Sequence, residues 1–199
     1  MIQVGNKSLI NFLRRGRKLK NVYLQKYNNL KYFICCYDEN QILKISSGLQ
    51  IIPSSAFKDS KIKNIQFEDK VKVIKQSAFE NCSELENLII GRNIEENKET
   101  DESNFVIEEV NANFTIQKDA FKNSSKLQTL VLPKCKKLVI EKNAFSGCET
   151  LRTVIALCKE IDFTENPFED CSESLTFICK KKSKLERFAR ENGFRSICL

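Results

Sequence analysis

The sequence of 199 residues predicts an α/β repeat solenoid, with a parallel β-sheet on one face, short return segments and a C-terminal capping helix. Three observations support this fold class. A phenylalanine recurs at intervals of 22, 42, 24 and 23 residues, a strand-like apolar pattern follows each of these phenylalanines, and a helix signal lies near the C-terminus. A short unit of this kind cannot bury its apolar face alone, and the stacking of successive units buries it.

Each unit is anchored by a phenylalanine that follows an alanine, or a proline in the last unit. An apolar residue stands five positions before it, and a serine or cysteine three positions after it. The anchors are Phe57, Phe79, Phe121, Phe145 and Phe168, the apolar residues are Ile52, Ile74, Ile116, Ile140 and Phe163, and the small residues are Ser60, Cys82, Ser124, Cys148 and Cys171. We expect the phenylalanines to stack as an interior ladder at the ~4.8 Å spacing of neighbouring strands. Serine and cysteine can interchange at this position because both are small. A cysteine that formed a disulfide or bound a metal could not be replaced by serine.

A strand-like segment with apolar residues at its first, fourth and sixth positions follows each anchor. The clearest copies begin at Leu85 and Leu127, and looser copies begin at Ile62, Leu151 and Leu175. Because successive side chains of a strand point to opposite faces, the residues between the apolar positions should face outward. They form one column of Asn64, Asn87, Thr129, Thr153 and Phe177 and a second column of Gln66, Ile89, Val131, Ile155 and Cys179.

Two segments carry a family resemblance: SAFENCSELENLII at residues 77–90 and NAFSGCETLRTVI at residues 143–155. They resemble the BspA-type leucine-rich repeat, which occurs in many copies in bacterial and protozoan surface and intracellular proteins. The resemblance runs from residue 49 to the C-terminus, with departures at Pro167, Ser60 and Ser124. It implies a leucine-rich-repeat solenoid of the surface-antigen-like kind, with the adhesion roles for which the family is known.

We therefore expect a single leucine-rich-repeat domain over residues 1–199. Residues 1–48 should form degenerate units, because Phe12 lies 45 residues, or about two units, before Phe57. Residues 49–180 should form the repeats. The long interval after Phe79 holds an insertion near residues 91–112, which is polar and acidic and is expected to be a loop or a degenerate unit.

Residues 181–199 are expected to cap the array. Ser183 and Glu186 form a capping-box pattern, and Gly193 can end the helix that this pattern begins. Leu185, Phe188 and Ala189 would form the apolar face of the helix, and a last apolar strand would follow it.

The net charge of +7 is a local property. Residues 1–37 contain eight basic and no acidic residues, and the rest of the chain contains 25 basic and 26 acidic residues. The centre of this excess is a basic patch of Arg14, Arg15, Arg17, Lys18 and Lys20. Such a patch can bind nucleic acid or another acidic surface. The repeat register places it in a solvated turn instead, so nucleic-acid binding is kept as the alternative function.

The sequence contains no catalytic motif and no histidine, and its nine cysteines contain no C-x-x-C pair. We therefore predict a protein that is not an enzyme, with no catalytic residues, no cofactor and no metal. Cys135 and Cys158 share a register, each ten residues before its phenylalanine. They could hold a metal or bond to each other, although a plain core or turn position is the favoured interpretation.

These features predict a protein–protein interaction scaffold that binds a protein ligand on the sheet face. The predicted contact residues are Asn64, Gln66, Asn87, Ile89, Thr129, Val131, Thr153, Ile155 and Phe177. An apolar column on a solvent-facing sheet often marks a contact surface. The alternative is that these β-branched residues stabilise the sheet laterally and bind nothing. The chain itself is expected to be a monomer.

The location is expected to be cytoplasmic, with the cell surface reached by a non-classical route as the alternative. No apolar run is long enough to span a membrane, and no secretory signal is visible. The Asn-x-Ser/Thr triplets at Asn81 and Asn123 fall in the tight turn after the anchor, where a glycan would interfere with stacking.

Overall fold

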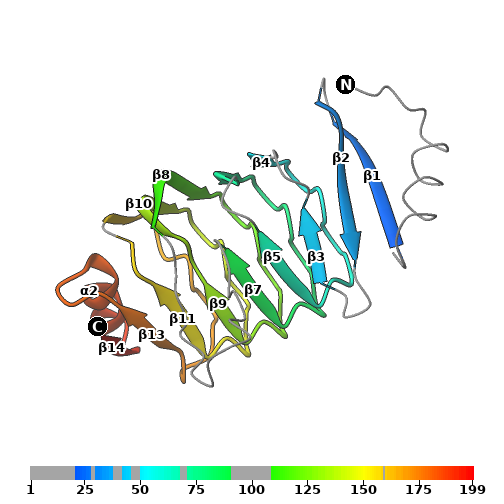
Figure 1. Ribbon diagram of the computed structural model, residues 1–199. Helices are drawn as coiled ribbons and strands as arrows, with labels where there is room; N and C mark the ends of the chain where they lie inside the picture. The colour runs from blue at the N-terminus through cyan, green and yellow to red at the C-terminus, as the bar shows by residue number, and fades with distance from the viewer. Residues whose placement is uncertain are drawn as a thin grey trace, which may run out of the picture.

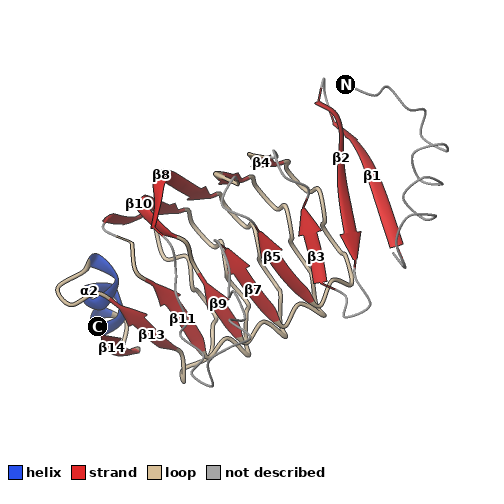
Figure 2. Ribbon diagram, in the orientation of Figure 1, coloured by secondary structure: helices blue, strands red, loops and turns tan. Residues whose placement is uncertain are grey.

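Two β-sheets and one short helix make up the described part of the chain (Figure 1 and Figure 2). The computed structural model describes residues 21–27, 30–37, 42–45, 50–67, 71–90, 109–158 and 160–199, and side chains from residue 50 onward except 109–111. The larger sheet, called the long sheet, has the order β1-β2-β3-β5-β7-β9-β11-β13-β14, and the smaller one, called the short sheet, has the order β12-β10-β8-β6-β4.

The strands of the long sheet are β1 (Asn21–Tyr27), β2 (Leu30–Tyr37), β3 (Ile42–Ile45), β5 (Asn64–Phe67), β7 (Asn87–Ile90), β9 (Thr129–Val131), β11 (Thr153–Ala156), β13 (Thr176–Cys179) and β14 (Arg195–Cys198). Those of the short sheet are β4 (Ile51–Ile52), β6 (Val73–Ile74), β8 (Glu109–Ile116), β10 (Lys134–Ile140) and β12 (Glu160–Phe163). The helix α2 spans Lys184–Glu191.

The chain winds through about five turns, and each turn supplies one strand to each sheet. The predicted repeat solenoid is therefore confirmed. The short sheet was not predicted, because only short return segments were expected in this part of each turn. Its inward-facing residues include Ile52, Ile74, Ile116 and Ile140, which the sequence had placed five positions before each anchor and which are all at most 1% exposed.

The anchors form the predicted interior ladder. Successive rings stack nearly parallel, with centroid distances of 4.9 Å from Phe57 to Phe79, 5.0 Å to Phe121, 5.3 Å to Phe145 and 5.4 Å to Phe168. The rings fill the space between the two sheets, and those of Phe79, Phe121 and Phe145 are fully buried. Aromatic contacts add about 0.5–1.5 kcal/mol per pair beyond the apolar area that they bury.

The backbone around each anchor also bonds to the next turn. The N–H groups of Phe57, Phe79, Phe121 and Phe145 donate to the residue before the next anchor, at 2.7–2.8 Å. Residues two positions away on either side donate to the next turn as well, as Asn81 does to Lys122 O at 2.8 Å. The N–H groups between them bond back within their own turn, so this alternation satisfies the buried backbone.

This alternation requires a left-handed backbone two residues before and two residues after the anchor. The earlier position holds Ser55, Ser77, Asp119 and Asn143, and the later one holds Asp59, Asn81, Asn123, Gly147 and Asp170, all with φ between +54° and +71°. Asparagine, aspartate and glycine tolerate this region best. Side chains at the later position also form hydrogen bonds between turns. Asn81 Nδ2 donates to Asp59 Oδ1 at 2.9 Å, and Asn123 Nδ2 donates to Asn81 Oδ1 at 3.0 Å.

The serine and cysteine column has a hydrogen-bonding role that size alone does not explain. Cys82, Ser124, Cys148 and Cys171 each donate to the carbonyl of the anchor in the preceding turn, over 3.2–3.5 Å. A hydroxyl and a thiol can both make this contact. This position therefore requires a small side chain that can donate a hydrogen bond. The described cysteines at this position are free thiols.

The long interval between Phe79 and Phe121 does not interrupt the stack. Phe79 lies directly against Phe121, and β7 pairs directly with β9 through Asn87 and Thr129. No extra turn therefore separates these two units in the described part of the chain. Residues 91–108 themselves lie outside the described residues.

The first two strands pair differently from the strands of the repeats. β1 and β2 pair as antiparallel strands, and β2 is also antiparallel to β3, whereas the pairing from β3 to β14 is parallel. β1 and β2 therefore form an antiparallel pair at the edge of the long sheet, and the degenerate units expected over residues 1–48 stay a prediction. The physical reason is the connection: only residues 28–29 separate β1 and β2, and a connection this short can join only antiparallel strands.

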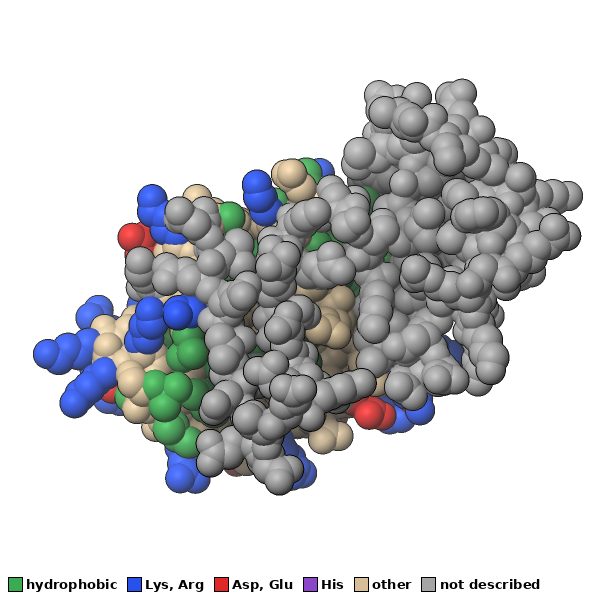
Figure 3. All heavy atoms as spheres, in the orientation of Figure 1, with side chains coloured by type: hydrophobic (Ala, Val, Ile, Leu, Met, Phe, Trp, Pro, Cys, Tyr) green, Lys and Arg blue, Asp and Glu red, His purple; other side chains and the backbone are tan. Residues whose placement is uncertain are grey.

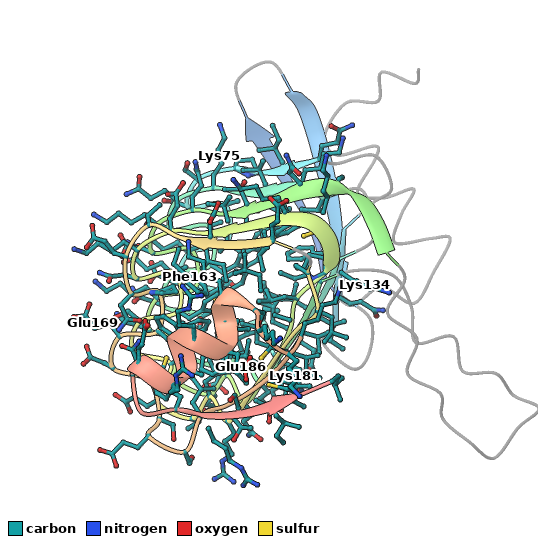
Figure 4. The ribbon with its side chains drawn as sticks, turned by 90° about the vertical axis from the view of Figure 1, so that its left-hand side faces the viewer. Lys75, Lys134, Phe163, Glu169, Lys181 and Glu186 are labelled. Atoms are coloured by element: carbon teal, nitrogen blue, oxygen red, sulfur yellow. The ribbon has the colours of Figure 1, made fainter. Side chains whose placement is uncertain are left out.

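The C-terminal cap forms as predicted (Figure 4). Ser183 caps α2 by accepting a hydrogen bond from Glu186 N at 3.2 Å, and Gly193 follows the helix with φ +74°. Phe188 of α2 contacts Phe163 at 4.9 Å and Phe168 at 6.0 Å between ring centroids. The helix thus covers the last ring of the ladder, and β14 extends the long sheet beside β13.

The donor role of the small column predicts the effect of substitutions at Cys148. Cys148→Ser keeps a donor to Phe121 O and should change the free energy of unfolding by less than about 1 kcal/mol. Cys148→Ala removes the donor and leaves a small void, so it should cost roughly 1–3 kcal/mol. Urea denaturation of both variants measures the difference. A serine variant no more stable than the alanine variant would contradict a donor role.

Candidate protein-binding surface

The outer face of the long sheet holds the residues that the sequence analysis singled out. Asn64, Asn87, Thr129 and Thr153 occupy consecutive strands in one register, as predicted. Their side chains are half-buried, and Asn87 Nδ2 donates to Asn64 Oδ1 at 2.8 Å. This polar column is therefore ordered by contacts between neighbouring strands.

The second outer column is also in register. Gln66 pairs with Ile89, Ile89 with Val131, and Val131 with Ile155. Gln66, Ile89 and Ile155 are half-buried, but Val131 is only 4% exposed. The expectation that Val131 faces solvent is thus wrong, although its strand places it on the outer face. It offers little surface to a ligand.

The predicted register of the fifth unit is wrong by one residue. Phe177 and Cys179 were expected on the outer face, but both point into the core and are 0% exposed. Thr176 pairs with Thr153 and Ile178 pairs with Ile155, so these two residues occupy the outer columns. A shift of one residue moves every side chain of a strand to the opposite face.

The error came from aligning the fifth unit on Leu175. The strands β7, β9, β11 and β13 all begin eight residues after their anchors, whereas Leu175 lies one position later than Leu151 does in its unit. A turn in which Ser174 N donates to Ser172 Oγ at 3.2 Å precedes Leu175, which is still buried. The spacing from the phenylalanine would have given the correct register.

The corrected register extends the apolar column to the C-terminal edge of the sheet. Ile178 pairs with Ile197 of β14, so a row of five β-branched residues runs across five neighbouring strands. We call this row the outer stripe, and it consists of Ile89, Val131, Ile155, Ile178 and Ile197. Its exposure is greatest at the last strand, where Ile197 is 43% exposed.

Basic side chains lie beside the more exposed end of the outer stripe. Arg195 continues the polar column next to Thr176, and Lys180 follows β13 directly. Residues 180–199 contain seven basic and two acidic residues, and Lys and Arg side chains gather at this end of the molecule (Figure 3). The basic patch of Arg14, Arg15, Arg17, Lys18 and Lys20 lies outside the described residues.

The comparisons with known proteins agree with this architecture. Residues 31–114 and 107–194 match the BspA-type leucine-rich repeat region, in six copies. The chain belongs to the BspA-type leucine-rich repeat family. Repeat regions of this family are generally interaction scaffolds and not enzymes.

Two solved structures are similar to this BspA-type chain. The pneumococcal vaccine antigen PcpA shares 17% sequence identity over 80% of this chain and 41% of its own, with a TM-score of 0.44. A leucine-rich repeat protein from Bacteroides ovatus ATCC 8483 shares 13% identity over 85% of this chain and 57% of its own, with a TM-score of 0.38. The chain thus spans about half the length of these structures. No curated protein matches it.

The thiols of Cys82 and Cys171, which follow their anchors by three residues, are poor nucleophiles. Burial raises the pKa of Cys82 to about 11 and that of Cys171 to about 12, and only the thiolate is an efficient nucleophile. Within the described ranges, no three cysteine or carboxylate side chains lie close enough together to hold a metal ion. The described helix lacks the length and apolar character needed to cross a membrane.

The Asn-x-Ser/Thr triplets occupy two different environments. The side-chain nitrogens of Asn81 and Asn123, where a glycan would be attached, donate hydrogen bonds along the left-handed column. A glycan on either would therefore sit directly beside the side chain of the preceding turn. Asn113 lies in β8 instead, and both Asn113 and Asn123 are exposed. The cytoplasmic location itself stays a prediction.

The corrected register predicts a large loss of stability for substitution of Phe177 and a small one for substitution of its neighbour Ile178. Phe177→Ser removes a buried ring that contacts Phe168 and Phe194 at 5.2 and 5.6 Å, so it should cost about 3–5 kcal/mol of unfolding free energy. Ile178→Thr keeps a β-branched residue on the outer face and should cost about 1 kcal/mol or less. Denaturant titration measures both. Equal costs, or the reverse order, would contradict the register.

Proposed function

We propose that this BspA-type chain is a non-enzymatic scaffold that binds a protein ligand through the outer stripe and the polar column beside it. The observation that carries the proposal is the outer stripe, which places five β-branched residues in register on the outer face of a sheet. Successive side chains of a strand point to opposite faces, so the outward positions of a sheet with one solvated face are normally polar. A continuous apolar row on the outer face is therefore unusual, and such rows mark contact surfaces.

Lateral packing between neighbouring strands is the alternative explanation of the outer stripe. It accounts for Val131, which is 4% exposed between Ile89 and Ile155. It gives no reason for an isoleucine at position 197, which has a neighbouring strand on one side only and remains 43% exposed. The exposed end of the row, at Ile155, Ile178 and Ile197, is thus the part available to a ligand.

The charges beside this end define the chemistry of the ligand. Arg195 and Lys180 flank Ile178 and Ile197, and Arg152 is exposed next to Thr153. A protein surface with apolar side chains at its centre and carboxylates at its rim would complement this arrangement, since rim charges govern specificity and association rate. We infer a ligand of this kind.

Binding of nucleic acid through the N-terminal basic patch stays a prediction. It requires an affinity that falls steeply with salt concentration and is lost when Arg14, Arg15, Arg17 and Lys18 are neutralised. Retention on heparin that does not depend on salt, or no retention, would exclude it. The outer stripe favours the protein ligand.

A triple variant tests the protein ligand. Ile155→Thr, Ile178→Thr and Ile197→Thr together should reduce recovery of the ligand at least about tenfold in a quantitative pull-down, because each change removes apolar contact area while keeping a β-branched residue. The control is Val139→Thr on the outer face of the short sheet, where Val139 pairs with Thr115 and Asp162. The binding partner is the protein recovered by the wild type and by this control. Undiminished recovery of that protein by a folded triple variant would disprove the assignment.

A further inference from the structure

Two cysteines of neighbouring turns meet in the core. Cys135 lies in β10, and Cys158 lies two residues before β12 begins. Their sulfur atoms are 3.4 Å apart, and the side chains are 2% and 1% exposed. The two residues are 23 positions apart, which is also the offset between the paired residues Lys137 and Glu160 of β10 and β12. They therefore continue the register of the parallel pair.

The backbone of such a pair is compatible with a disulfide. Neighbouring strands lie roughly 4.8 Å apart, and disulfides form between Cα atoms about 4.4–6.8 Å apart. Closing the two sulfur atoms to bonding distance, about 2.05 Å, needs a shift of little more than 1 Å. Small changes in the two side-chain torsions can supply this shift.

The reduced pair is a hydrogen-bonded chain. Cys158 Sγ donates to Pro133 O at 2.8 Å, and the Cys135 thiol lies in hydrogen-bonding contact with Cys158 Sγ. That contact lowers the pKa of Cys158, whereas the same contact and burial raise the pKa of Cys135. Pro133 O would keep a hydrogen-bond donor after oxidation of the thiols, since Cys135 N also donates to it at 3.0 Å.

We propose that Cys135 and Cys158 are a modification site, at which an intramolecular disulfide joins the fourth and fifth turns when the chain folds in the presence of a low-molecular-weight disulfide. The thiolate of Cys158 attacks glutathione disulfide and releases one reduced glutathione. Cys135 then attacks the mixed disulfide and releases the second. Two protein thiols lose two electrons and two protons, which the two glutathione thiols carry away. Because both residues are buried in the folded chain, the exchange occurs before the two turns have packed together.

The disulfide would fix one turn of the solenoid on the next. It would close a loop that contains β11 and the anchor Phe145, and so restrict the unfolded chain. A chain that folds in a reducing compartment would keep the two thiols, and one that folds in an oxidising compartment would carry the cross-link.

The full chain folded in a mixture of reduced and oxidised glutathione tests the proposal. After alkylation of the free thiols, peptide mapping should show Cys135 linked to Cys158. The midpoint of thermal unfolding should exceed that of the reduced chain by about 10 °C. Recovery of both residues as alkylated thiols from the folded chain would overturn the proposal, and so would a cross-link only between Cys179 and Cys198, which are also in register.

Matched variants separate the cross-link from general effects of cysteine replacement. Cys158→Ser and Cys135→Ser should each abolish both the linked peptide and the difference between oxidised and reduced midpoints. Cys82→Ser should keep both, because its neighbours in its column are Ser60 and Ser124 and it has no cysteine partner there. Each variant is first compared with the wild type under reducing conditions, and two independent partners keep the test valid if one serine variant fails to fold. A midpoint difference that survives in both partner variants would contradict the assignment.

Discussion

The stacking of one phenylalanine on the next is the contact on which the rest of the structure depends. The four ring pairs from Phe57 to Phe168 hold successive turns at 4.9–5.4 Å, close to the spacing of neighbouring strands. At the same positions, the backbone donates to the next turn at 2.7–2.8 Å. The ring contacts and the backbone hydrogen bonds are thus both satisfied at the same distance between turns. Each turn can bury its apolar residues only when its neighbours keep this register.

This register also determines the chemistry of the surface. Since β7, β9, β11 and β13 each begin eight residues after their anchors, equivalent residues of neighbouring turns fall into straight columns. On the outer face this aligns Ile155, Ile178 and Ile197 beside Arg195. Inside, the same alignment brings Cys135 against Cys158. The outer stripe and the thiol pair therefore both follow from the ladder.

Much of this arrangement could be predicted from the sequence, because the solenoid repeats its side chains as well as its backbone. The anchors, the small column and the C-terminal cap were each visible as residue types at fixed spacing. The left-handed positions on either side of the anchor were missed, although Asn81, Asn123 and Gly147 carry the signal in their residue types. The register of β13 was missed because Leu175 is an apolar residue at a shifted position, and local hydrophobicity outweighed the spacing from Phe168. The antiparallel pairing of β1 and β2 could not be predicted from the repeat pattern, since it is set by a short connection.

Amide hydrogen exchange of the native chain tests the central role of the ladder most directly. If stacked anchors hold the turns together, the N–H groups of Phe79, Phe121 and Phe145 should be among the slowest to exchange and should open only with global unfolding. They lie in turns outside both sheets, where amides usually exchange quickly. Exchange of these three amides as fast as that of the exposed amides of α2 would show that the turns open locally, and would contradict the account.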